Sequence, residues 1–133
     1  MKVFCLEDEI HVAPRNAIKQ VLSKHELTIA LNYAEAVAKY GVQAGYGLIL
    51  LDGDMFGFPD MTNPPIKDSG YGFCVWMVKQ AQWFPKPPEI FIHTQNPFVG
   101  GKMHKVLKGA GFTNIQEIPF SQGYVKMLKE RWG

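Results

Sequence analysis

Residues 47–54, with the sequence GLILLDGD, decide how this chain folds. The run of Leu and Ile from Gly47 to Leu51 is apolar on both sides, which is typical of a central strand covered by helices on both faces. Asp52, Gly53 and Asp54 follow it, and alternate residues of an extended chain point the same way. The stretch therefore predicts a buried strand that brings the carboxylates of Asp52 and Asp54 to one edge of a sheet.

The rest of the chain alternates apolar strands with helical patterns. The predicted strands are Lys2–Leu6, Leu27–Leu31, Gly47–Leu51, Glu89–Ile92 and Ile115–Ile118. The predicted helices are Pro14–Leu22, Tyr33–Tyr40, Tyr71–Trp83, Gly100–Gly109 and Ser121–Trp132, the last with Ser121 as its cap. This alternation predicts an α/β fold with a parallel sheet between two layers of helices, in one domain that spans residues 1–133.

The composition is that of an ordinary globular protein, with 47% hydrophobic and 20% charged residues. A net charge of +2 does not indicate nucleic acid as a partner. No stretch reaches the roughly 18 apolar residues of a membrane span, so we expect a cytoplasmic protein with no membrane partner. Cys5 and Cys74 lie in apolar runs and are expected to be buried, reduced thiols.

Polar side chains follow three of the predicted strands. Glu7 and Asp8 follow the first, Asp52 and Asp54 the third, and His93 the fourth. Ligands of parallel α/β sheets bind beyond the carboxyl ends of the strands, so these residues are predicted to share a pocket.

Clustered carboxylates repel one another unless a cation or a shared proton compensates. Glu7, Asp8 and Asp52 are therefore candidate ligands for Mg²⁺ or another divalent metal, which prefers carboxylates, water and phosphate oxygens. The alternative for these acids is structural, namely capping of the following helices or pairing with Lys102 or Lys105.

His93 is a candidate acid-base residue, because imidazole titrates near neutral pH. Thr94 and Asn96 follow it and offer a hydroxyl and an amide to a phosphate or a ribose. Lys102 lies near the start of the next predicted helix, where backbone amides attract phosphate. The alternative for His93 is a structural residue that satisfies its hydrogen bonds inside the fold.

With these residues placed, the chain resembles the receiver domains of two-component signalling, whose flavodoxin-like, three-layer fold has a five-stranded parallel sheet of order 2-1-3-4-5. Glu7 and Asp8 match the acidic pair of a receiver, and Asp52 matches its phospho-accepting aspartate. The chain departs from receivers at His93, where they have Thr or Ser, and at Ile118, where they have a lysine before the proline. The missing lysine disfavours a phosphorelay.

Four short motifs are more similar to the family of cyclic-phosphate processing receiver domains. In this chain they read Leu6-Glu7-Asp8-Glu9, Leu51-Asp52-Gly53-Asp54-Met55, Asp68-Ser69-Gly70-Tyr71-Gly72 and His93-Thr94-Gln95-Asn96-Pro97, followed by Gly100, Gly101 and Met103. The departures are Gly53 for a histidine, Glu9 for an aspartate and Thr94 for a serine.

This resemblance implies hydrolysis or other processing of a cyclic phosphate on a nucleotide or an ADP-ribose-like small molecule. In that interpretation His93, Asp52 and Asp54 are catalytic, and Thr94, Asn96 and Lys102 bind the substrate. The metal ligands are Glu7, Asp8 and Asp52. The alternative is a non-catalytic receiver-like module that binds a partner protein or a nucleotide, and a phosphoaccepting response regulator is a third interpretation.

Overall fold

The computed structural model of the chain describes residues 1–53 and 70–133. Its strands are β1 (Lys2–Leu6), β2 (Glu26–Ala30), β3 (Leu48–Asp52), β4 (Glu89–His93) and β5 (Ile115–Glu117). Its helices are α1 (Ala17–Val21), α2 (Tyr33–Lys39), α3 (Gly70–Met77), α4 (Pro97–Gly109) and α5 (Gln122–Trp132).

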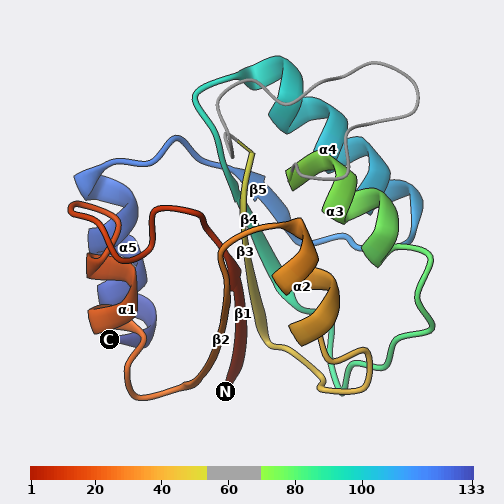
Figure 1. Cartoon of the computed structure of the whole chain (residues 1–133), viewed down its shortest axis with the longest axis horizontal. Coiled ribbons are helices and arrows are strands. Elements are labelled where there is room, and N and C mark those ends of the chain that lie inside the picture. The colour runs from red at the N-terminus through yellow and green to blue at the C-terminus, as the bar shows by residue number, and fades with distance from the viewer. Residues whose placement is uncertain (54–69) are drawn as a thin grey trace.

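The strands form one parallel sheet in the order β2-β1-β3-β4-β5, which confirms the predicted topology. Figure 1 shows the sheet between two layers, with α1 and α5 on one face and α2, α3 and α4 on the other. Each face has its own buried core. The central strand β3 is buried along its whole length and contributes to both cores, as its apolar sequence predicts.

Three helices, α1, α3 and α4, differ from their predicted bounds by three residues or more at one end. Helix α1 covers only Ala17–Val21. Helix α3 ends at Met77, whose carbonyl oxygen accepts a hydrogen bond from Nε2 of Gln82 at 2.7 Å, so the chain turns away where a longer helix was predicted. Helix α4 begins at Pro97, earlier than predicted, because the side chain of Asn96 caps it and proline is well tolerated in a first turn.

Both cysteines are buried and free, as predicted. Burial raises the pKa of each thiol well above its usual value, so both remain protonated and act as small apolar side chains. Among the helices of the described ranges, none combines the length and the apolar character that crossing a membrane requires.

Candidate functional site

Three strands bring one polar side chain each to the carboxyl edge of the sheet. Asp52 and His93 are the last residues of β3 and β4 and are register partners, and Glu7 follows β1 directly. Each offers a donor atom within 4.8 Å of those of the other two. Glu7 and His93 are fully buried, and Asp52 is 2% exposed. We call Glu7, Asp52 and His93 the strand-end cluster.

Glu7 connects the other members of the strand-end cluster. Its Oε2 lies 2.8 Å from Nε2 of His93, and its carboxylate is hydrogen-bonded to the side chain of Asp52. Its Oε1 lies 2.5 Å from Nε of Arg15, so the two residues form an ion pair. The contact is not a hydrogen bond, because the Nε–H of Arg15 does not point at the oxygen. Glu7 is therefore the centre of the site and not a helix cap.

Burial raises the pKa of Glu7 to about 7. The hydrogen bond with Asp52 and the charge of Arg15 oppose this rise, whereas the neighbouring charges of Asp8 and Glu9 add to it. A carboxyl group with this pKa near neutral pH holds a proton or needs a nearby cation. The same property makes the cluster a place where a cation would bind favourably.

Aromatic rings cover the histidine on the α5 side of the sheet. The ring of His93 lies 5.7 Å from the ring of Tyr124 and 6.2 Å from that of Phe120, centroid to centroid. The guanidinium of Arg15 lies 4.6 Å from the centroid of Phe120. Arg15, Phe120 and Tyr124 were not predicted as site residues from the sequence. The one signal available for Arg15 was a basic residue soon after three consecutive acids.

The other predicted acidic residues are not members of the strand-end cluster or lie outside the described residues. Asp8 is half-buried in the turn after β1, and among the described residues it is not part of the group that could hold a metal. Glu9 is exposed, with Oε2 3.5 Å from Nη1 of Arg15. Asp54 lies outside the described residues, so its predicted alignment with Asp52 stays a prediction.

Thr94 and Asn96 build the turn that connects β4 to α4. The backbone N–H of Asn96 donates to Oγ1 of Thr94 at 3.0 Å. The Oδ1 of Asn96 accepts from the backbone N–H groups of Phe98 at 3.0 Å and Val99 at 3.4 Å. Two amides of this helix start, where phosphate was predicted to bind, are therefore occupied by the cap. The predicted substrate roles of Thr94 and Asn96 stay predictions.

Lys102 lies on α4 with an exposed side chain, and its Nζ is 5.7 Å from the centroid of the Phe98 ring. Within the described ranges, the ion pairs of Glu7 are formed by Arg15 and His93. The alternative in which Lys102 or Lys105 pairs with Glu7 therefore does not describe this structure. The predicted contact of Lys102 with substrate stays a prediction.

Close packing explains the glycine that follows Asp52. A Cβ atom on Gly53 would lie 2.9 Å from Cβ of Thr94 and 3.3 Å from Sδ of Met103. The backbone N–H of Gly53 also donates to the carbonyl oxygen of His93 at 3.0 Å. Because it has no side chain, Gly53 lets the chain stay next to β4 after β3 ends at Asp52. A histidine side chain would not fit at this position without displacing Thr94.

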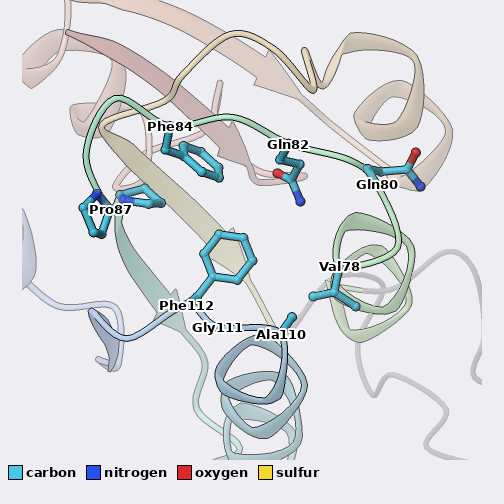
Figure 2. A pocket seen from close by; sticks show the side chains of 9 residues that line it. Val78, Gln80, Gln82, Phe84, Pro87, Ala110, Gly111 and Phe112 are labelled. Carbon is cyan, nitrogen blue, oxygen red and sulfur yellow. The ribbon is translucent and has the colours of Figure 1, made fainter.

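Cavities lie at both edges of the sheet. One of about 320 Å³ lies at the carboxyl ends of β4 and β5 and is lined by Thr94, which follows His93, and by Gln95, Pro97, Glu117 and Pro119. Figure 2 shows another, of about 370 Å³, which is lined by Phe84, Pro87 and Phe112 among others. Its residues precede β4 and β5, so it lies at the amino ends of the strands, away from the cluster. Of these two cavities, the first lies at the edge of the sheet that carries the predicted site residues.

The family of cyclic-phosphate processing receiver domains matches residues 1–109. The chain belongs to this family. The match includes all three residues of the strand-end cluster and extends through α4. No curated protein matches the sequence.

Solved structures of receiver domains share the fold. A CheY-like response regulator receiver domain protein from Methanospirillum hungatei is 17% identical with a TM-score of 0.57, covering 98% of this chain and 92% of its own. The response regulator TrrA from Thermotoga maritima, in complex with Mg²⁺ and BeF, is 20% identical with a TM-score of 0.54, covering 96% and 97%. The Mn²⁺-bound form of response regulator Rcp1 is 18% identical with a TM-score of 0.60, covering 97% and 89%. At these identities the similarity establishes the fold.

The strand-end cluster has a composition that fits a divalent cation. Two carboxylates and one imidazole offer donor atoms close enough to surround one ion. Carboxylates suit Mg²⁺ and Mn²⁺, and an imidazole shifts the preference from Mg²⁺ toward the transition metals. The raised pKa of Glu7 points the same way, because a bound cation would stabilise its ionised form.

Proposed function

We propose that this receiver-like protein hydrolyses a cyclic phosphate on a nucleotide or an ADP-ribose-like compound. The observation that carries the proposal is the convergence of Glu7, Asp52 and His93, with donor atoms within 4.8 Å of one another at the carboxyl edge of the sheet. Membership of the cyclic-phosphate processing family supports the choice of substrate class. A cavity of about 320 Å³ offers space beside Thr94, the residue after His93.

The proposed reaction opens the phosphate ring with one water molecule. The water oxygen forms a bond to phosphorus, and one of the two ring P–O bonds breaks. A base takes a proton from the water and an acid gives one to the departing oxygen, so the products are a phosphate monoester and a free hydroxyl. His93 transfers the proton in this scheme. Glu7 orients its ring through the 2.8 Å contact with Nε2.

The carboxylates have the second role. Glu7, Asp8 and Asp52 would hold Mg²⁺ or another divalent ion, which when bound supplies positive charge to the phosphate oxygens. Asp52 and Asp54 would also position the attacking water. Thr94, Asn96 and Lys102 would contact the phosphate and the sugar from the start of α4. Of the three donors close enough to share one ion, the carboxylates of Glu7 and Asp52 would hold it, and His93 would transfer the proton.

One observation favours the non-catalytic alternative, in which the domain binds a nucleotide or a partner protein. The side chain of His93 is fully buried and in contact with Glu7. A catalytic histidine must reach its substrate, so this burial is more typical of a residue that holds the strand ends together.

The test is a screen of the full chain against 2′,3′-cyclic nucleotides and ADP-ribose cyclic phosphate, with and without Mg²⁺ or Mn²⁺. Phosphorus NMR follows the appearance of the monoester. We expect one of these compounds to be opened in a metal-dependent way, and Asp52→Asn to slow the reaction. Glu130→Gln, which changes an exposed carboxylate outside the site, is the matched control. Tight binding without opening would establish the non-catalytic alternative.

A further inference from the structure

Arg15 brings a positive charge to a site that otherwise gathers negative ones. Among the lysines and arginines of the described residues, it is the one that forms an ion pair with Glu7. Its side chain is 19% exposed, whereas that of Glu7 is fully buried. The guanidinium thus extends from the solvent side of the protein to the buried carboxylate.

The guanidinium is held in a defined orientation. Its Nε lies 2.5 Å from Oε1 of Glu7, and its Cζ lies 4.6 Å from the centroid of the Phe120 ring. Nη1 lies 3.5 Å from Oε2 of Glu9, a carboxylate whose side chain is 60% exposed. Exposed ion pairs of this kind contribute little, so a stronger anion can replace Glu9.

A phosphate group entering this edge of the sheet meets the carboxylates of Glu7 and Asp52, which repel it. It needs a fixed cation beside the cluster, and a guanidinium binds phosphate through two parallel N–H groups. We propose that Arg15 is the phosphate-binding residue of this site, with Nε kept on Glu7 and its Nη groups directed to the phosphate oxygens. The proposal rests on the proposed function only for the identity of the compound that carries the phosphate.

The surroundings of Arg15 leave access from solvent. A cavity of about 410 Å³ lies between α1 and α5 and is lined by Pro14, Ala17, Phe120 and Val125 among others. Pro14 is adjacent to Arg15 in the chain, and the ring of Phe120 packs against the Arg15 guanidinium. The phosphate compound would therefore lie in or beside this cavity, whose lining includes the chain neighbour of Arg15 and the aromatic ring next to its guanidinium.

The test is a titration of the full chain with inorganic phosphate, followed by the ¹H–¹⁵N resonance of the Arg15 Nε–H. We expect this resonance to shift in the wild type, and Arg15→Gln to weaken phosphate binding by at least about tenfold, the loss of one charge-assisted pair. Arg15→Lys, which keeps the charge without the planar fork, should also bind more weakly than the wild type. Lys19→Gln is the control, because Lys19 is a cation on α1 whose Nζ contacts His11.

A folded Arg15→Gln with wild-type phosphate affinity would overturn the proposal, as would an equal loss in Lys19→Gln. If Arg15→Gln does not fold, two other measurements test the proposal: the shift of the Arg15 Nε–H resonance in the wild type and the phosphate affinity of Arg15→Lys. A wild-type resonance that phosphate does not shift overturns the proposal. The outcome is separate from that of the cyclic-phosphate screen. Phosphate can bind at Arg15 in a protein that hydrolyses nothing, and hydrolysis can proceed in a protein whose Arg15→Gln variant binds phosphate normally.

Discussion

At the scale of single residues, Glu7 has the least ordinary environment of the site. It is buried between a histidine, an aspartate and an arginine, and its pKa is raised from 4.5 to about 7. The raised pKa means that the folded protein favours the protonated form of this carboxyl group. That preference is fully available below the unfolded pKa near 4.5, and it is lost as the pH rises through about 7.

The prediction is a loss of stability between pH 5 and pH 8 in metal-free protein. Glu7→Gln removes the titrating group, so the free energy of unfolding of this variant should fall less than that of the wild type over this range. The two losses should differ by at most about 3 kcal/mol. Denaturant unfolding in the presence of EDTA at several pH values measures this difference. Glu130→Gln should keep the wild-type profile. Identical profiles for the wild type and Glu7→Gln would contradict the raised pKa.

At the scale of elements, β3, β4 and α4 meet without spare room at Gly53. Gly53→Ala would place a Cβ 2.9 Å from Cβ of Thr94, and this overpacking should cost about 1 to 3 kcal/mol of stability. Gly101→Ala is the matched control, because a Cβ there meets nothing within 4 Å and alanine favours a helix over glycine by about 0.5 to 1 kcal/mol. Urea unfolding of the two variants compares them. If Gly53→Ala is as stable as the wild type, Thr94 at the end of β4 can shift to make room for the added methyl group at little cost.

The elements themselves were predictable from local patterns, and their ends were less so. The apolar run of β3 and the cap at Ser121 each follow from a few neighbouring residues. The end of α3 does not, because it depends on Gln82, whose side chain also accepts a hydrogen bond from the hydroxyl of Tyr40 on the neighbouring chain segment. Contacts between residues distant in sequence leave no periodic signal.

The same distinction applies to the site. The positions of Asp52 and His93 followed from strand ends in a parallel sheet, and Glu7 was expected beside them. The direct pairing of Glu7 with His93, 86 residues apart, was not predictable. Neither was the position of Arg15, because it lies in an irregular segment before α1, which no helical or strand pattern places.

At the scale of the whole molecule, the fold is that of a receiver but one signalling component is missing. Ile118 precedes Pro119 where receivers have a lysine. We therefore expect that Asp52 forms no long-lived acyl phosphate. Intact mass after incubation with acetyl phosphate and Mg²⁺ checks this, and the expected mass is that of the unmodified chain. A stable gain of one phosphoryl group that Asp52→Asn abolishes would instead identify a phosphoaccepting regulator.

The proposed function requires that the strand ends of this molecule form one catalytic site for a cyclic phosphate. The most direct test is the turnover of the cyclic phosphate found by the screen, measured for His93→Ala beside His25→Ala, a histidine that lies just before β2, at the amino edge of the sheet, with Nε2 2.8 Å from the carbonyl oxygen of Trp132. We expect that His93→Ala slows turnover by about 10²- to 10⁴-fold with an intact fold, and that His25→Ala turns over at the wild-type rate. A folded His93→Ala with wild-type turnover would contradict it.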